Sequence, residues 1–410
     1  MSHLSYLEKL MGGSEVEWKP LDELIVSLKT GLNPRKNFQL NTDDADGYYV
    51  TVREIQNGKV VFLEKTDRVN RIALELINNR SNLEAGDILF SGTGTVGRTA
   101  VIKEKPLNWN IKEGVYVIKP LKQVVSPKYL SHLLNSQEIV KEYSKKIVGS
   151  PVISLPMGEL KKLKIPIPCP DNPEKSLAIQ AEIVRILDAF TELTAELTAE
   201  LTAELNLRKK QYNYYRDQLL SFEEGEVEWK ALGKIAEINT GQKPSEILDT
   251  EAEFDYINAG TTRSGYCALS NCEGDTVTTP SRGQGGIGFV GYQNKSFWLG
   301  PLCYKIRSID NKALINKYLF YILQSKNQLL LGLKKEGGVP AVNKSDLAKL
   351  EVPVPSVAEQ ERIVEILDKF DTLTTSIQEG LPREIELRQK QYEYYRDLLL
   401  SFPKPEEVVA

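Results

Sequence analysis

Histidine is almost absent from this 410-residue chain, which contains only His3 and His132. His132 lies in a segment with helical spacing, where packing is a commoner role than metal binding or general base catalysis. The sequence contains no Walker A loop, no PD…ExK nuclease set and no NPPY-type tetrapeptide for base methylation. Carboxylates are abundant, but on the expected helices they stand near Lys and Arg, as on solvated faces. Catalysis within this chain is therefore poorly supported.

Cysteine and long apolar runs are also scarce. The four cysteines, at positions 169, 267, 272 and 303, form no CxxC pair, which argues against a zinc site or a redox motif. No run of 18 apolar residues could span a membrane, and residues 1–13 lack the apolar core of a secretion signal. We therefore expect a cytoplasmic protein with reduced thiols and no membrane partner.

The chain has no overall excess of positive charge, because 52 Lys and Arg stand against 56 Asp and Glu, a net charge of −4. The acidity is confined to residues 171–225 and 356–410, which carry −5 each, whereas residues 14–168 carry +5 and residues 226–355 carry +1. A mildly basic domain is only a weak signal for nucleic acid. The distribution does, however, divide the chain into two matching pairs of segments.

An internal duplication is the strongest feature of the sequence. EVEWK occurs at residues 15–19 and again at 226–230. Near the end of each copy, LRKKQYNYYRDQLLSF at residues 207–222 is matched by LRQKQYEYYRDLLLSF at 387–402. The offset between the copies shrinks through the first part of each copy and is then constant across the last part. This pattern is expected when loops differ in length in the first part and the length of the last part is fixed.

Each copy begins with a part in which short apolar runs alternate with turns. The runs Gly58–Leu63, Asp87–Phe90 and Gly114–Ile118 are typical of strands. Lys128–Leu134 and Lys317–Leu323 carry apolar residues three and four apart and are expected to be helices. Because no strand–helix–strand rhythm is present, we expect α+β domains rather than a doubly wound sheet.

The second part of each copy is helical. No Gly or Pro occurs in residues 177–222, which predicts one helix on the order of 70 Å long. The second copy contains Gly380 and Pro382, so we expect one helix to end near Glu379 and the next to start at Pro382. The two copies could pair as an antiparallel coiled coil, or each could pack on its own domain. The expected seam comprises Ile183, Phe190, Leu193, Leu197, Leu201, Leu205, Ile363 and Phe370.

These patterns predict four segments. Residues 1–168 hold an N-terminal segment and the first α+β domain, 171–225 the first helix, 226–355 the second domain and 356–410 the C-terminal helices. Within the first helix, residues 191–205 read TEL followed by TAEL three times. One four-residue unit lengthens a helix by about 6 Å and rotates it by about 40°. The number of units could therefore tune the separation of the two domains, or the array could be a good helix former with no special role.

Two segments, Gly92–Gly97 and Gly283–Gly288, fit the GxGxxG pattern. Binding of a dinucleotide or a methyl donor by this pattern requires a following helix whose N-terminus faces the ligand. The residues that follow, Arg98–Ile102 and Phe289–Tyr292, instead predict strands. We therefore interpret both segments as tight turns that let the backbone approach another surface, with DNA as the expected surface and a plain turn as the alternative.

Candidates for DNA contact are side chains that can reach base edges or phosphates from loops. An ordinary surface position is the alternative for each of them, and corresponding positions in the two copies favour contact. The candidates are Arg35, Lys36, Arg53, Thr93 and Arg98 in the first domain, and Arg263, Arg282, Gln284, Asn343 and Lys344 in the second.

Together these motifs resemble the specificity subunits of type I restriction-modification systems, in detail those of type IC. The resemblance covers essentially the whole chain, although the two variable domains carry little of it. It rests on the EVEWK openings, the IPIP and VPVP exits at 165–168 and 352–355, IVRILDAF at 183–190, IVEILDKF at 363–370, the YYRD segments and the TAEL array. The residues before the first EVEWK also look like a partial copy of those before the second, which fits the circular organisation of that family.

The resemblance implies a non-catalytic subunit. Each variable domain would read one half of a split double-stranded DNA target, and the paired helices would set the unspecified spacer. Two methyltransferase subunits and the restriction–translocase subunits would dock on the chain. The candidates for methyltransferase docking are Tyr212, Tyr215, Arg216, Tyr392, Tyr395 and Arg396. S-adenosylmethionine, ATP and Mg²⁺ would belong to those partners, which methylate a flipped-out adenine or cleave, so no cofactor is expected in this chain.

Two other classes of protein are alternatives to this interpretation. A self-contained methyltransferase or nuclease would need the missing tetrapeptide or metal ligands. A structural scaffold that uses the repeats as a spacer would not bind DNA, so a salt-dependent affinity for DNA separates it from a specificity subunit.

Overall fold

The computed structural model describes residues 6–34, 37–223, 225–283, 285–335, 339–375 and 379–404. The chain divides into two compact units: unit 1 comprises residues 1–198 together with 386–410, and unit 2 comprises residues 199–385. Each unit combines one α+β domain with parts of the long helices.

Unit 1 is built around a four-stranded antiparallel sheet in the order β2 (Ile25–Thr30), β10 (Val115–Pro120), β7 (Ile88–Ser91), β8 (Thr99–Val101). A three-stranded sheet follows the order β6 (Arg68–Val69), β3 (Gly47–Val50), β9 (Trp109–Ile111), with β3 and β9 parallel. β1 (Val16–Pro20) pairs with β11 (Lys164–Pro168), so that the EVEWK opening lies beside the IPIP exit. β4 (Ile55–Gln56) and β5 (Lys59–Val60) form a small hairpin.

The helices of unit 1 surround these sheets. They are α1 (Tyr6–Met11), η1 (Leu21–Leu24), η2 (Val52–Glu54), α2 (Arg71–Arg80), α3 (Pro127–Leu134), α4 (Gln137–Ser144) and α5 (Met157–Lys161). The predicted helix at residues 128–134 is confirmed as α3, whose apolar residues are buried in the core. The predicted strand at residues 58–63 is only partly present, because β5 ends at Val60 and the apolar residues after it are exposed.

Unit 2 repeats this plan. Its four-stranded sheet has the order β13 (Ala236–Thr240), β19 (Cys303–Ser308), β16 (Thr276–Pro280), β17 (Gly291–Gln293). Its three-stranded sheet has the order β15 (Tyr266–Cys267), β14 (Phe254–Ile257), β18 (Trp298–Leu299), again with one parallel pair. β12 (Glu228–Ala231) pairs with β20 (Glu351–Val354). The helices are α7 (Leu232–Ile235), α8 (Asn316–Ser325), α9 (Asn327–Gly332) and α10 (Lys344–Leu347). The duplication and the α+β class are thereby confirmed.

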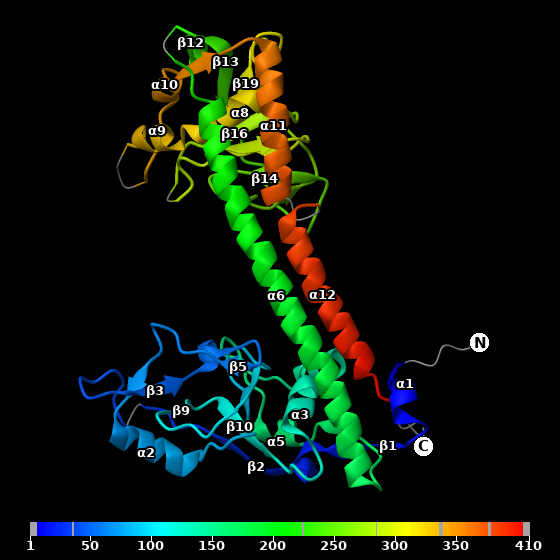
Figure 1. Cartoon of the computed structure of the whole chain (residues 1–410). Helices are drawn as coiled ribbons and strands as arrows, with labels where there is room; N and C mark the ends of the chain where they lie inside the picture. The colour runs from blue at the N-terminus through cyan, green and yellow to red at the C-terminus, as the bar shows by residue number, and fades with distance from the viewer. Residues whose placement is uncertain are drawn as a thin grey trace. The chain divides into compact units, whose positions relative to one another are not determined.

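The long helices follow the predicted breaks closely. α6 runs without interruption through 47 residues, Pro173–Leu219, and continues from unit 1 into unit 2 (Figure 1). α11 (Val357–Thr375) and α12 (Leu381–Leu399) are separate helices, with Pro382 in the first turn of α12, where its missing N–H costs no hydrogen bond. Glu379 lies between them in a turn.

Helix pairing is antiparallel within unit 1, where Phe190 and Thr191 of α6 meet Tyr395 and Tyr392 of α12. In unit 2, Tyr215 of α6 stacks on Phe370 of α11. The prediction of paired helices is confirmed, with one correction to the seam: Leu193 is 50 % exposed. The four-residue period rotates each successive leucine by about 40°, so Leu193 faces solvent while Leu197, Leu201 and Leu205 are half-buried.

Each unit is closed by the final segment of a repeat. Leu399, Leu400 and Phe402 lie in the core of unit 1 together with Ile183, and Leu220 lies in the core of unit 2 together with Ile363. The YYRD-containing segment at residues 387–402 therefore packs on the first domain, and its copy at residues 207–222 packs on the second. This exchange is the structural counterpart of the circular organisation that the resemblance implied.

A buried glutamine fastens each long helix to its domain. In unit 1, the Gln180 amide accepts a hydrogen bond from the backbone N–H of Ser126 at 2.8 Å and donates one to the carbonyl of Val124 at 2.9 Å. In unit 2, Gln360 accepts from the N–H of Ile315 and donates to the carbonyl of Ala313, both at 2.9 Å. Because a buried amide must keep its partners, each pair of bonds fixes where the helix begins on the domain.

An aspartate directly after an Ile-Leu pair of each long helix adds an electrostatic contact. Asp188 lies 3.2 Å from Nε2 of His132 and also contacts Lys128, both on α3. Those hydrogen bonds, that from His132 first, lower the pKa of Asp188 to about 2. In unit 2, Asp368 contacts Tyr321 and lies 3.3 Å from Lys317, both on α8. His132 therefore has a packing and positioning role, as its helical setting predicted.

Candidate nucleic-acid interface

In each unit a glycine loop lies between two neighbouring strands at one edge of the four-stranded sheet. It comprises residues 91–98 between β7 and β8 in unit 1, and residues 281–288, without the undescribed 284, between β16 and β17 in unit 2. The predicted strand after the first loop is confirmed as β8, whereas that at residues 289–292 is only partly present, because β17 begins at Gly291. Gly92 packs so closely on Tyr116 that a Cβ would lie 2.1 Å from a ring carbon, and Gly94 has φ +82°. Glycine is therefore required at both positions, for close approach and for backbone conformation respectively.

A bridging hairpin holds the glycine loop of unit 1 in place. This hairpin is residues 148–154, closed by two backbone hydrogen bonds of 2.8 Å between Val148 and Ser154. Gly94 N donates to the carbonyl of Ile153 at 2.8 Å, and the Thr93 and Ser154 hydroxyls are 3.1 Å apart. The loop is thus fixed along its length and is not merely a free surface turn.

Unit 2 has the same frame with different side chains. Its bridging hairpin is residues 335–341, of which 336–338 are not described, and Lys335 and Ala341 exchange backbone hydrogen bonds of 2.8 and 3.2 Å. Gly283 N donates to the carbonyl of Pro340 at 3.1 Å. Arg282 and Ala341 form an isolated antiparallel β-bridge, as Thr93 and Ser154 do in unit 1. Thr93 and Arg282 were chosen separately from the sequence and occupy equivalent positions of the two domains.

A third segment, the strand-end loop, follows the central strand of the three-stranded sheet: residues 51–54, which include η2, after β3, and residues 258–265 after β14. In unit 1, Arg98 of the glycine loop donates to the carbonyl of Val52 at 3.1 Å, next to Arg53. In unit 2, Gly286 lies so close to Ala259 that a Cβ would be 1.9 Å from its carbonyl oxygen. The strand-end loop and the glycine loop are therefore neighbours in both units, and both carry exposed arginines.

The arginines differ in their partners. Arg53 contacts Asp67 at 3.1 Å, and Arg263 lies 3.6 Å from Asp255 with its guanidinium 4.5 Å above the ring of Tyr266. Within the described ranges, neither Arg98 nor Arg282 forms an ion pair with a carboxylate. Arg98 and Arg282 therefore present uncompensated positive charge, which phosphate oxygens or guanine could neutralise.

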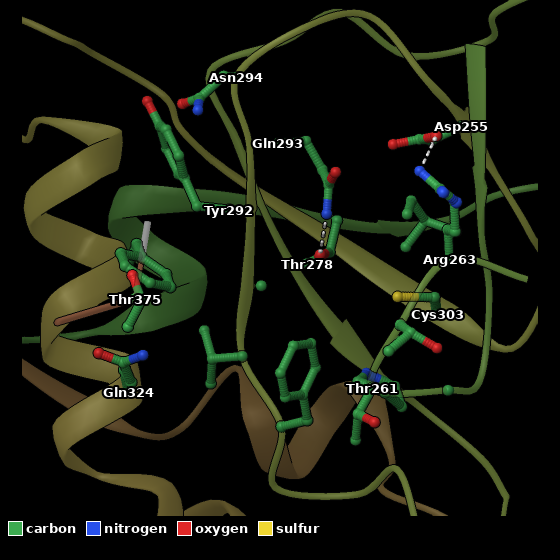
Figure 2. Close-up of a pocket in the computed structure, with 18 of the residues that line it drawn as sticks. Asp255, Thr261, Arg263, Thr278, Tyr292, Gln293, Asn294, Cys303, Gln324 and Thr375 are labelled. Atoms are coloured by element: carbon green, nitrogen blue, oxygen red, sulfur yellow. Dashed lines mark hydrogen bonds and ion pairs between the residues drawn. The ribbon is translucent and has the colours of Figure 1, made fainter. Parts of the chain in front are cut away.

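Unit 2 also has a surface hollow of about 710 Å³ beside its strand-end loop (Figure 2). Thr261 and Arg263 line it from that loop, Thr278 and Gln293 from the sheet, and Gln324 from α8. The amide of Gln293 donates to the Thr278 hydroxyl at 3.3 Å, which orients this polar wall. The hollow beside the strand-end loop thus gathers hydroxyls, amides and the guanidinium of Arg263, together with Lys317 and the carboxylates of Asp255 and Asp371.

The remaining candidates fall into two groups, those outside the described residues and those with partners inside unit 2. Arg35, Lys36 and Gln284 lie outside the described residues. Lys344 donates to the side-chain oxygen of Asn239 at 3.3 Å, and Asn343 donates to Asp346 at 3.3 Å, at the start of α10. Both side chains already have hydrogen-bond partners within unit 2.

The proposed docking residues are also used within the units. Tyr212 bonds to Gln324 and Tyr392 bonds to Thr191, while Arg216 and Arg396 are half-buried beside their neighbouring aspartates. The adjacent tyrosines, which the sequence analysis did not select, are more exposed: Tyr214 is 59 % and Tyr394 is 64 % exposed. Consecutive residues of a helix differ by about 100° in direction, so the two tyrosines of each YYRD motif face different sides.

No group of three or more His, Cys, Asp or Glu suited to a metal ion occurs in the part of the chain that the structure describes. Among the described helices, none combines the length and the apolar character that crossing a bilayer requires.

Comparison with known proteins matches both copies. A model of the type I restriction modification DNA specificity domain matches residues 14–207 and 224–387. The chain is 41% identical over 435 aligned positions to the EcoR124I/EcoR124II specificity subunit of Escherichia coli, with 100% of both chains covered. It is 37% identical to the EcoprrI specificity subunit of Escherichia coli, covering 92% of this chain and 93% of that one.

A chain from a solved structure of the type I R-M system, determined to explain its complex assembly and conformational transition, has the same fold. It superposes with a TM-score of 0.64 at 17% identity, covering 94% of this chain and 97% of that one. Two copies of an α+β domain, each followed by a long helical segment, thus define a DNA specificity architecture. The chain belongs to the type I restriction-modification specificity subunits. It is a non-catalytic subunit, as the resemblance implied, and its type IC subclass stays a prediction.

Proposed function

We propose that this subunit reads a split, asymmetric DNA target, with one half-site contacted by each unit. The observation that carries the proposal is the repeated frame of glycine loop, bridging hairpin and strand-end loop. The frame recurs in both units, but the threonine at position 93 of the first glycine loop is matched by an arginine, Arg282, in the second. Equal frames with unequal side chains are suited to two different base sequences.

The fixed spacer between the half-sites is proposed to follow from the length of α6. Its 47 residues correspond to about 70 Å of continuous helix, and the TAEL array lies in its middle. A continuous helix transmits both length and rotation, since each added residue moves its end by about 1.5 Å and 100°. The number of tetrapeptides would thereby set which base pairs the two units can reach together.

Docking of two methyltransferase subunits is proposed on the outward faces of α6 and α12. Leu207 and Tyr214 are exposed on α6, and their copies in the repeat, Leu387 and Tyr394, are exposed on α12. Two equivalent apolar faces are suited to two copies of one partner. Restriction subunits would join the same complex. S-adenosylmethionine, ATP and Mg²⁺ would be bound by those partners.

The test is single-molecule methylation sequencing of DNA from a host that expresses this chain with its methyltransferase partner. One new split motif, with a methylated adenine in each half and a constant gap, is the expected result. Absence of any new motif, in cells where the complex is shown to assemble, would contradict the reading function and favour a scaffold.

A further inference from the structure

Both bridging hairpins carry an exposed valine at the same point of the hydrogen-bonded frame. In unit 1, Val152 is 62 % exposed and precedes Ile153, whose carbonyl accepts from the glycine loop. In unit 2, Val339 is 55 % exposed and precedes Pro340, whose carbonyl accepts from the equivalent glycine. One exposed apolar side chain is ordinary on a protein surface. Two at equivalent points of a backbone that is fixed to a DNA-reading loop form a repeated feature.

The hairpins that carry the two valines are hydrogen-bonded to glycine loops that carry cationic groups. All residues from 148 to 153 are exposed, and Val148 and Ile153 accompany Val152 at the tip of the first hairpin. Arg98 ends the glycine loop of unit 1, and Arg282 begins that of unit 2, each without an ion-pair partner among the residues described. A protein partner that covered an apolar tip would also have to neutralise these guanidinium groups, whereas DNA supplies phosphates for them.

Base pairs present one apolar group in the major groove, the 5-methyl of thymine. A valine on a fixed loop can contact this methyl without any hydrogen-bonding group of its own. We propose that Val152 and Val339 each pack against the 5-methyl group of a thymine in the half-site that their unit reads. This inference rests on the proposed function and adds to it the side chains that distinguish one base by apolar contact. Loss of one buried methyl is expected to weaken binding about fourfold.

The test uses deoxyuridine, which pairs like thymidine and lacks only the methyl group. The full chain, assembled with its methyltransferase partner, is titrated at fixed salt against the split target found by methylation sequencing. Each thymidine of each half is replaced in turn. Wild type is expected to lose affinity about three- to fivefold at one position in each half.

The variants assign each effect to a unit. Val152→Ala should abolish the thymidine–deoxyuridine difference in one half and keep it in the other, and Val339→Ala should do the converse. Ile72→Ala in unit 1 and Leu269→Ala in unit 2 are matched controls, because these side chains are 71 % and 69 % exposed outside the frame. Both controls should keep both differences.

Two results would overturn the inference while the proposed function stands. In the first, wild type binds the split target specifically, but replacing thymidine with deoxyuridine does not lower the affinity in one of the halves, or the loss of affinity persists after the valine of that unit is substituted. The other is impaired assembly with the methyltransferase in the valine variants, with deoxyuridine effects unchanged, which would assign the hairpins to protein contact. Failure of wild type to prefer the split target would instead refute the proposed function itself.

Discussion

Phe190 stacks face to face on Tyr395, with 5.5 Å between the ring centroids and 5° between the ring planes. The same pair recurs in unit 2 with the roles of the copies exchanged: Phe370 stacks on Tyr215 at 5.8 Å and 29°. The phenylalanine always comes from the first half of a helical segment and the tyrosine from the last half of the other copy. Each unit therefore contains one such stack, between a phenylalanine of one copy and a tyrosine of the other.

Breaking either stack should loosen one unit and leave the other intact. Stacked aromatic pairs contribute about 0.5–1.5 kcal/mol beyond their burial. A double-mutant cycle of Phe190→Leu and Tyr395→Leu should therefore give a coupling of about 1 kcal/mol in the free energy of unfolding of unit 1. The pair Phe190→Leu and Tyr215→Leu, whose residues belong to different stacks, should be additive. Equal coupling in both combinations would contradict this assignment.

Gln180→Leu should destabilise unit 1 by about 2–3 kcal/mol, because the N–H of Ser126 and the carbonyl of Val124 lose their partner. Gln360→Leu should do the same in unit 2. Hydrogen exchange can localise the loss to the corresponding unit, and Gln389→Leu, at an exposed position of α12, serves as the control. Unchanged protection around Ser126 in the Gln180 variant would show that the amide does not fasten the helix.

The contact of Asp188 with His132 and Lys128 should make the stability of unit 1 sensitive to acid. Its pKa is lowered to about 2, so the stability that it contributes is fully present above its ordinary range near pH 4 and is lost as pH falls towards 2. The side chain is 40 % exposed, so after screening by solvent the effect is on the order of 1 kcal/mol. Asp188→Asn should be less stable than wild type at pH 6, and the difference should shrink between pH 4 and pH 2. Glu192→Gln, at an exposed position of α6, should show no such trend.

The fold could be predicted largely from repetition. Because EVEWK and the IPIP-type exit each occur twice, the two copies are expected to form the same structure, and they do pair as β1 with β11 and β12 with β20. Gly380 and Pro382 predicted the break between α11 and α12 because of their backbone constraints. The exposure of Leu193 was missed, since periodicity gives a stripe but does not say where a four-residue repeat rotates it off the buried face.

The candidate site was predicted in part. Thr93, Arg98 and Arg282 lie on the glycine loops, whose glycine patterns predicted close backbone approach, and Arg263 lies on a neighbouring loop; the contact of these residues with DNA stays a prediction. The bridging hairpins were not predicted, since their frame depends on hydrogen bonds between backbone groups that are distant in the sequence, as from Gly94 to Ile153. Side-chain type in a sequence carries no signal for such bonds.

Removing one arginine should affect the half-site of one unit. Arg98→Ala is expected to relax sequence preference in a single half if the guanidinium contacts a base, at a cost equivalent to about 1–3 kcal/mol. If it contacts a phosphate, binding should weaken equally for all DNA sequences, and the slope of log affinity against log salt concentration should fall in magnitude by about one. Affinities at several salt concentrations separate the two cases. Lys162→Ala, at an exposed position of unit 1, should change neither property.

Deleting residues 202–205, one TAEL unit, shortens α6 by about 6 Å and rotates its end by about 40°. Since base pairs are spaced by about 3.4 Å, the gap of the recognised motif should contract by about one or two base pairs. Replacing the same four residues with alanines should keep the gap, because helix length and phase are unchanged. Methylation sequencing measures the gap for both variants. An unchanged gap in the deletion variant would refute the proposal that the length of α6 sets the spacer.

The discontinuous composition of unit 1 has a consequence for synthesis on the ribosome. Unit 2 is a continuous stretch of residues 199–385, whereas unit 1 needs residues 386–404 to cover its core with Leu399, Leu400 and Phe402. At about 5–20 residues per second, the first domain emerges roughly 10–40 s before its closing helix. The domain made second can thus mature first, and the domain made first waits with apolar surface uncovered. Nascent chains should therefore depend on chaperones over that interval more than their finished form suggests.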